Sequence, residues 1–257
     1  MLKPGTIPYL HATFEEIETK AAAPHVISAS RATDIPAFFG AWFQKQLEQG
    51  YVKRKNPFSG KYYYISLSNA AAFVFWTKNP RPFLPFLEQF SQDFYFQYTL
   101  NNYDHTRLEP NLPILEERLI TFQQLSKKYG KSRILWRFDP IMILPEMPLE
   151  AVIERIEHTA NSLMGFTERL TISFLTLKSY KAARNRLAMA YPEIAQDPSM
   201  AIPAGSQRIK ILNYLKDLQE RWKKVDPEFT IQACAMPDDF TAYEIYPSRC
   251  IDDQLLG

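Results

Sequence analysis

Serine, aspartate and lysine side chains stand at the ends of two apolar runs of the chain. Ser28, Ser30 and Asp34 follow the apolar residue Ile27, and Lys78 ends the run AFVFWTK. Serine hydroxyls and aspartate oxygens form hydrogen bonds with ammonium and ribose groups, while a lysine ammonium pairs with a carboxylate or a phosphate. These residue types predict a binding site for a small ligand that carries charged and hydroxyl groups.

Ordinary structural roles explain part of this first group. Asp34 is followed by Ile35 and Pro36, so its side chain is suited to cap the start of a helix. A cation at Lys78 would oppose the dipole of a helix that starts after it. We therefore expect an anionic ligand or partner near its ammonium group.

A second group of polar side chains ends the next two apolar runs. Gln97, Thr99 and Asn101 lie in or after FYFQYTL, and Arg137 and Asp139 lie in RILWRFD. Arg137 and Asp139 are two residues apart, so on a strand their side chains share a face. Two interpretations stay open: the pair neutralises itself, or it joins Gln97 as the catalytic, substrate-side group of a site.

A polar loop, NNYDHTRLEPN, separates the third apolar run from a helical stretch. Glu109 lies in this loop, and Arg118 lies on the helix that follows. We expect these two residues to form a salt bridge that holds the loop. The loop is long enough to line a pocket.

These polar groups belong to a repeating order of strands and helices. Short apolar runs alternate with amphipathic stretches such as LPILEERLITFQQLSKKYG, whose apolar positions recur with helical period. Strands that alternate with helices form a parallel sheet, and ligands bind at the carboxyl ends of its strands. We therefore predict an α/β fold, a parallel (β/α) barrel or partial barrel of TIM type. The expected strands lie near residues 25–30, 72–78, 94–100, 133–139, 170–176 and 229–235.

Residues 53–71 depart from this pattern. Turn-forming residues Asn56, Pro57 and Gly60 join two short extended pieces there, which predicts a hairpin-like insertion. No linker or repeat interrupts the remaining sequence, so we expect one domain over residues 1–257.

The composition excludes several classes of protein. Hydrophobic residues make up 46% of the 257, enough for a large core, and a net charge of +2 gives no general bias toward nucleic acid. Two cysteines exclude a disulfide framework, and the four histidines lack metal-ligand spacing, so no metal ligands are predicted. No signal peptide or membrane-spanning run is recognisable, so we expect a cytoplasmic protein without a membrane partner.

Several motifs, taken in order, resemble an uncharacterised bacterial family of domains of unknown function. They are ISASRATDIPAFF, VFWTKNP, FYFQYTL, ILWRFDPI and CAMPDDF. Members of that family usually carry a C-terminal cysteine cluster that looks like the iron-sulfur motif of radical S-adenosylmethionine (SAM) enzymes. These cysteines are missing from the sequence, and we expect truncation of the chain before them rather than their loss.

The same motifs are more distantly similar to spore photoproduct lyase and its radical SAM relatives. This resemblance implies a barrel of the radical SAM type, in which Ser30 and Lys78 hold the carboxylate and ribose of SAM and Thr99 contributes at the next strand end. Ser28 and Asp34 join them as expected SAM-binding residues. An iron-sulfur cluster is implied for the family, although its ligands are absent here, and the implied reaction is hydrogen abstraction from an unknown substrate.

The same residues allow a second interpretation, in which the protein is an oxygen-stable enzyme. Lys78 and Arg137 would bind a phosphate or carboxylate compound in such an enzyme. Its acid-base groups would be Asp34, Asp139 or Glu109.

A nucleic-acid-binding module is a third reading. In the stretch YVKRKNPFSGKYYY, basic residues such as Lys53 and Arg54 alternate with aromatic side chains. Aromatic rings stack on bases and basic groups pair with phosphates. A solvated hairpin with tyrosines packed beneath it is the structural alternative.

Overall fold

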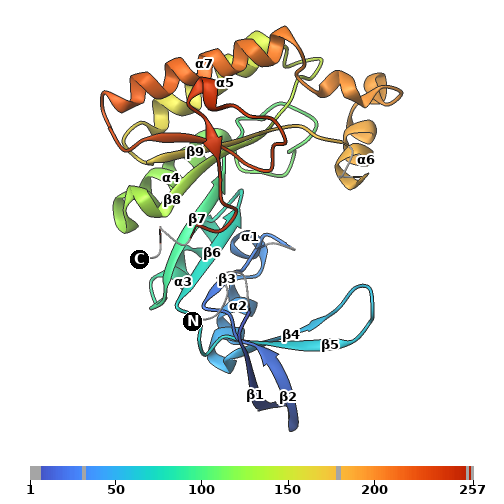
Figure 1. Ribbon diagram of the computed structural model, residues 1–257, viewed down its shortest axis with the longest axis vertical. Helices are drawn as coiled ribbons and strands as arrows, with labels where there is room; N and C mark the ends of the chain where they lie inside the picture. Colours follow the sequence, from blue (N-terminus) through green and yellow to red (C-terminus); the bar gives the residue numbers. More distant parts are fainter. Residues whose placement is uncertain (1–6, 31–32, 178–180, 253–254, 256–257) are drawn as a thin grey trace. The chain divides into compact units, whose positions relative to one another are not determined.

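The computed structural model describes residues 7–30, 33–177, 181–252 and 255. It divides the chain into two compact units (Figure 1), one formed by residues 1–95 with 256–257 and one formed by residues 96–255. Parallel strands and buried side chains occur in both units. The expectation of a single domain stays a prediction.

The first unit contains two parallel strands, β3 (Val26–Ser28) and β6 (Ala72–Thr77). Five of the six residues of β6 are buried, as is usual for an apolar parallel strand that is covered on both faces. Helices α1 (Ile35–Phe38) and α2 (Gly40–Gln49) follow β3 in the chain. The left-handed residue Gly50, with φ of 82°, ends α2.

Aromatic rings form the core beside β6. Phe43 of α2 meets Phe73 and Phe75 edge-on, with ring centroids 5.5 Å apart in both pairs. Gly40 begins α2 at a point where a Cβ atom would lie 2.5 Å from the ring of Phe86, so a larger residue would displace that ring. The short helices η1 (Arg81–Phe83) and α3 (Leu84–Leu87) complete this layer.

A second sheet of the first unit has four strands in the order β1-β2-β5-β4. Its members are β1 (Tyr9–Phe14), β2 (Ile17–Ala22), β4 (Tyr51–Lys55) and β5 (Tyr62–Ser66). Strands β4 and β5 are antiparallel and form a hairpin, in the region where the turn residues indicated one. Phe14 packs against Tyr51 and Tyr64 at the base of this hairpin.

The hairpin of β1 and β2 has no counterpart among the predicted elements. Its two turn residues, Glu15 and Glu16, both have positive φ angles, of 50° and 66°. Two-residue hairpin turns need such angles and usually recruit asparagine or glycine for them. Because glutamates occupy both positions, the usual sequence signal is missing.

The second unit is built on parallel strands in the order β11-β10-β9-β8-β7. Strand β7 (Asp93–Thr99) crosses the boundary between the units, and the others are β8 (Ile134–Ile141), β9 (Arg169–Phe174), β10 (Thr230–Ala233) and β11 (Tyr246–Pro247). The six predicted strands are confirmed as β3, β6, β7, β8, β9 and β10. The predicted α/β class with parallel strands is confirmed as well.

Of the predicted barrel and partial barrel, the closed barrel is wrong, because the parallel strands form an open sheet. The strand order starts at β11 and does not return to it. Strand β11 has only two residues, and Pro247 lacks the N–H group that a further ladder would need. A short strand that ends in proline is suited to the edge of a sheet. It offers too few backbone groups to pair with a further strand and close a barrel. The partial barrel and the radical SAM type of fold stay predictions.

Three long helices cover one face of the second unit's sheet. They are α4 (Leu115–Tyr129), α5 (Leu149–Leu163) and α7 (Ser206–Lys223). Trp136 of β8 stacks on Trp222 of α7 with ring centroids 6.2 Å apart, and Tyr98 of β7 stacks on Phe122 of α4 at 5.2 Å. This face is therefore the core of the second unit. The remaining helices are α6 (Lys181–Ala190), η2 (Lys131–Arg133), η3 (Pro192–Ile194), η4 (Pro198–Ala201) and η5 (Thr241–Tyr243).

No helix within the described ranges is long and apolar enough to span a membrane.

Helices α5 and α7 are joined by a carboxylate. Glu157 of α5 accepts two hydrogen bonds from the guanidinium of Arg221 on α7, at 2.8 and 2.7 Å, and one from the hydroxyl of Tyr214. The hydrogen bonds from Arg221 are the main reason that the pKa of Glu157 is lowered to about 2. Figure 1 shows these two helices side by side.

We expect Glu157→Gln to reduce the free energy of unfolding at neutral pH but to have little effect in acid. A carboxylate whose pKa is lower in the folded state contributes stability above its unfolded pKa of 4.5, and this contribution is lost as the pH falls toward about 2. Urea unfolding of both proteins over this pH range measures the difference. Glu154→Gln, at an exposed position of the same helix, is the control, and a difference that is independent of pH would contradict the prediction.

Candidate functional site

The carboxyl ends of β3 and β6 lie side by side in the first unit. Ser28, the last residue of β3, is paired with Val74 of β6, and the backbone N–H of Ala29 donates to the carbonyl of Val74 at 2.9 Å. The residues that follow each strand therefore emerge at one edge. Ser30 and Lys78, two of the predicted cofactor-binding residues, lie directly beyond these ends.

Asp34 connects the two strand ends. One carboxylate oxygen accepts the N–H of Ala37 at 3.0 Å and caps α1, which confirms the expected capping role. The other oxygen accepts the backbone N–H of Lys78 at 2.9 Å, immediately after β6. Burial raises the pKa of Asp34, while the hydrogen bonds from Lys78, Thr77 and Ala37 act in the opposite direction.

The hydroxyl of Ser30 is buried without a hydrogen-bond partner in the described part of the chain. Ser30 as a whole is 7% exposed. A buried hydroxyl without a partner is uncommon and costs free energy, so it calls for an explanation such as a ligand. Ser28 and Lys78 are both half-buried, and Arg31, which follows Ser30, lies outside the described residues.

A row of polar side chains crosses the sheet of the second unit. Thr99 is paired with Arg137, Arg137 with Thr171, and Thr171 with Gln232. Paired residues of parallel strands point to the same face, and alternate residues such as Trp136 point to the other. The sheet therefore has an apolar face under the helices and an opposite face that carries this polar row.

Arg137 is held by the two residues that were predicted to act with it. Its guanidinium donates to Gln97 at 3.1 Å and to both carboxylate oxygens of Asp139, at 2.6 and 3.3 Å. Burial lowers the pKa of Arg137, but the interactions of its guanidinium with Asp139 and, to a smaller extent, with Cys234 outweigh burial and leave the pKa raised. The structure thus brings Gln97, Arg137 and Asp139 together as one bonded group.

Asn101 fixes the backbone of Asp139. Its amide N–H donates to the carbonyl of Asp139 at 3.0 Å, and its amide oxygen accepts the N–H of Asp139 at 2.9 Å. This exchange of hydrogen bonds joins the residues after β7 to the end of β8. It orients the Asp139 carboxylate toward Arg137, with an exposed fraction of 18% for the side chain of Asp139.

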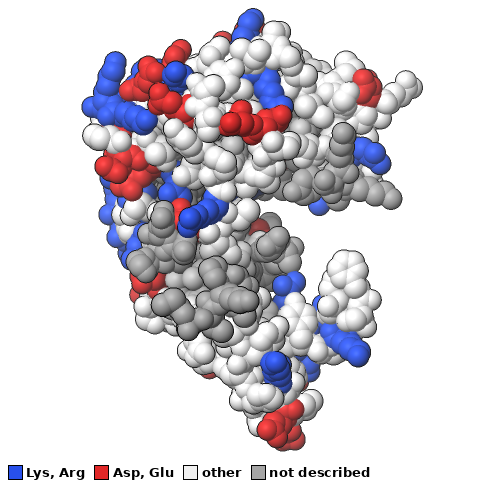
Figure 2. Space-filling view, viewed as in Figure 1, with Lys and Arg blue, Asp and Glu red and all other residues white. Residues whose placement is uncertain are grey.

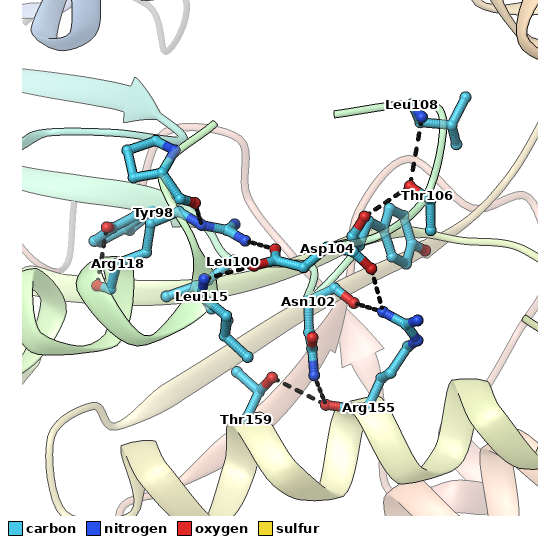
Figure 3. A network of polar contacts seen from close by, with 12 residues as sticks. Tyr98, Leu100, Asn102, Asp104, Thr106, Leu108, Leu115, Arg118, Arg155 and Thr159 are labelled. Carbon is cyan, nitrogen blue, oxygen red and sulfur yellow. Dashed lines mark hydrogen bonds and ion pairs between the residues drawn. The ribbon is translucent and has the colours of Figure 1, made fainter. Parts of the chain in front are cut away.

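The loop after β7 is anchored by Arg118 of α4 (Figure 3). We expected Glu109 as the partner of Arg118, but the ion pair that the structure shows for Arg118 is with Asp104. Asp104 also accepts the N–H of Leu115 at 2.6 Å, and the Nε of Arg118 donates to the carbonyl of Pro113 at 2.9 Å. Asp104 was the better partner because it reaches both the guanidinium and the first turn of α4.

A second arginine, Arg155 of α5, holds the same loop and was not predicted. Its guanidinium donates to the carbonyls of Asn102, at 2.5 Å, and Asp104, at 3.1 Å. The amide of Asn102 donates to the carbonyl of Arg155 at 3.2 Å (Figure 3). Carbonyl groups belong to every residue type, so the sequence held no signal for this contact.

The residues of this chain do not fit an iron-sulfur cluster. Such clusters are held by three or four thiolates, and the sequence has two cysteines. Cys234 is buried and Cys250 is exposed. Among the residues that the structure describes, no group of three or more His, Cys, Asp or Glu side chains is arranged to hold a metal ion.

We expect Arg137→Met to destabilise the protein by about 3–5 kcal/mol, because it leaves a buried acceptor and a carboxylate without their donor. The double variant Arg137→Met with Asp139→Asn should recover part of this loss. Lys223→Met is the control, since it breaks a more exposed pair with Glu244 at 3.4 Å and should cost less than about 1 kcal/mol. Equal losses in the buried and exposed variants, measured by urea unfolding, would contradict the prediction.

Comparison with known proteins gives one family. The family model described as "Domain of unknown function (DUF1848)" matches residues 26–257, which include both groups of strand-end residues. No curated protein and no solved structure matches the chain. The expected membership in a family of domains of unknown function is confirmed, while the relation to spore photoproduct lyase stays a prediction. The chain belongs to the DUF1848 family.

Proposed function

We propose that the first unit binds S-adenosylmethionine at the carboxyl ends of β3 and β6, through Ser28, Ser30, Asp34 and Lys78. The observation that carries this proposal is the Ser30 hydroxyl, which is buried without a hydrogen-bond partner in the described part of the chain. A ligand that bonds to this hydroxyl would remove the cost of burying it. The resemblance to radical SAM enzymes supplies the identity of the ligand.

The residue types suit the polar groups of this ligand. The Lys78 ammonium would pair with the carboxylate of the methionyl part, and the hydroxyls of Ser28 and Ser30 would bond to the carboxylate or the ribose. Each Asp34 oxygen already accepts one backbone N–H, at 3.0 and 2.9 Å. A carboxylate oxygen has a second lone pair, so Asp34 can still accept a hydrogen bond from the ligand's ammonium group.

The proposal covers binding and assigns no reaction step to these residues. A bound iron-sulfur cluster would supply the electron that cleaves SAM in radical SAM enzymes. The two cysteines of this chain cannot ligate such a cluster. Thr99, the weaker candidate, belongs to the second unit and is not part of the proposed site.

Gln97, Arg137 and Asp139 are the second candidate, as a substrate-side group in which the Asp139 carboxylate would act on the substrate. The polar row on one sheet face favours this function, and Asp139 keeps 18% of its side chain exposed and so remains accessible for acid-base chemistry. This function needs no radical. A hydrolytic or proton-transfer activity that survives air and chelator, and is lost in Asp139→Asn, would support it.

SAM binding to the full chain tests the main proposal, with equilibrium dialysis of radiolabelled SAM as the measurement. We expect Lys78→Ala to weaken binding about 10- to 100-fold, the range for loss of a charge-assisted hydrogen bond. Ser30→Ala should weaken binding about 2- to 10-fold without lowering the thermal stability, because it removes a buried hydroxyl that has no hydrogen-bond partner among the described residues.

Lys45→Ala, at an exposed position of α2 in the same unit, is the matched control and should bind as the unmodified chain does. The proposal is wrong if the unmodified chain fails to bind SAM at millimolar concentration. It is also wrong if Ser30→Ala and Lys78→Ala bind as tightly as the control.

A further inference from the structure

In the outer half of the β4–β5 hairpin, residues 54–63, the structure describes no strand pairing other than that of β4 with β5. Strand β5 pairs with β2 at a single position, Ala22 with Ile65, close to the base of the hairpin. In this outer half the strand pairs are Arg54 with Tyr63 and Lys55 with Tyr62. All four of these residues are exposed, so both faces are open to a ligand there, whereas Tyr64, one pair closer to the base, is buried.

Three aromatic rings of the outer half are exposed. The exposed fractions are 97% for Phe58 at the tip, 61% for Tyr62 and 39% for Tyr63. Tyr62 and Tyr63 are consecutive on β5, so their rings point to opposite faces. The expectation that the tyrosines pack beneath a solvated hairpin holds for Tyr64, which is buried against Phe14, but not for Tyr62 and Tyr63.

The charge of the hairpin has a single sign. Residues 51–66 contain four basic residues, Lys53, Arg54, Lys55 and Lys61, and no acidic residue. Figure 2 shows blue basic side chains in the region of the β4–β5 hairpin and a red acidic group at the end of the neighbouring β1–β2 hairpin. Such a strip of positive charge attracts a polyanion.

The four basic residues are not equivalent. Lys53 forms an ion pair with Glu15 of the β1–β2 turn, so its charge is already matched. Arg54, Lys55 and Lys61 are exposed. Lys55 lies over the ring of Tyr62 at 5.9 Å, and Arg54 is paired across the strands with Tyr63, so each face of the outer half carries a ring beside a cation.

The tip is held in one conformation. The side chain of Asn56 accepts the N–H groups of Phe58 and Ser59 at 2.9 and 3.1 Å, and the N–H of Gly60 donates to the carbonyl of Asn56 at 2.9 Å. Gly60 has a φ angle of 69°, which favours glycine at that position. Phe58 is thus presented at the tip by an ordered turn, which lowers the entropy that binding would cost.

We propose that this hairpin binds single-stranded nucleic acid. Bases stack on Phe58, Tyr62 and Tyr63, and phosphates pair with Arg54, Lys55 and Lys61. Stacking platforms interleaved with basic groups are the usual means of sequence-tolerant binding to single strands. A membrane surface would bury the apolar tip only, whereas the rings here continue down both faces of the strands, which favours a ligand with successive flat groups.

Fluorescence anisotropy tests this proposal with the full chain and a labelled oligothymidylate of about 20 nucleotides, longer than a single site of this kind needs. We expect binding that weakens as salt rises from about 50 to 200 mM. The variant Arg54→Gln/Lys55→Gln/Lys61→Gln should bind more weakly and show a salt slope that is smaller by about 2, since each phosphate contact in a single strand contributes about 0.7.

Matched variants separate stacking from general charge. Phe58→Ala and Tyr62→Ala should each weaken binding about 5- to 100-fold with an unchanged salt slope, and Phe58→Tyr should restore it. The charge control is Lys45→Gln/Lys210→Gln/Lys224→Gln, which removes three exposed lysines outside the hairpin and should leave binding unchanged.

Three results would overturn the proposal. One is the absence of binding to the oligothymidylate, and another is equal weakening by the hairpin and control triple variants. The third is binding to vesicles of anionic phospholipid without binding to the oligothymidylate, which would assign the hairpin to a membrane surface. SAM binding does not involve these residues, so its outcome leaves this test unaffected.

Discussion

Parallel pairing of buried strands is the constraint on which the rest of the structure depends. Residues paired in neighbouring parallel strands share a face, so the register that puts Trp136 under the helices also lines up Thr99, Arg137 and Thr171 on the opposite face. In the first unit the same rule brings the ends of β3 and β6 together. Polar residues that are far apart in the sequence therefore meet because the apolar residues between them must be buried.

Buried and half-buried charged groups hold the segments that follow the strands in both units. Asp34 ties the start of α1 to the end of β6, Arg118 ties the loop after β7 to α4, and Arg137 is bonded within the sheet. Each of these groups would cost several kcal/mol if it were buried without a partner. Hydrogen bonds are directional, so these groups restrict the positions of the polar strand ends more than apolar packing alone would. A binding site requires such ordered strand ends.

The exposed aromatic ring at the hairpin tip, unlike the rings of the core, is not explained by packing inside the protein. Nothing in the fold requires Phe58 to be aromatic, since 97% of its surface is exposed, and the hairpin that carries it has four basic residues and no acidic one. In the core an aromatic residue is explained by its neighbours, as Phe43 is by Phe73 and Phe75. The exposed ring of Phe58 has no such packing partners, and stacking on the proposed nucleic-acid ligand would explain why this position is aromatic.

The sequence by itself determined the six main parallel strands, the α/β class and the residues at the strand ends, because apolar runs and helical periodicity are local properties of the chain. It also indicated the cap at Asp34. Only the tertiary structure decided that the sheet is open, that Glu15 and Glu16 turn a hairpin, that Arg118 pairs with Asp104, and that Arg155 binds backbone carbonyls. These outcomes depend on which distant segments come close together and on backbone carbonyl groups that every residue has. The local pattern of residue types therefore does not predict them.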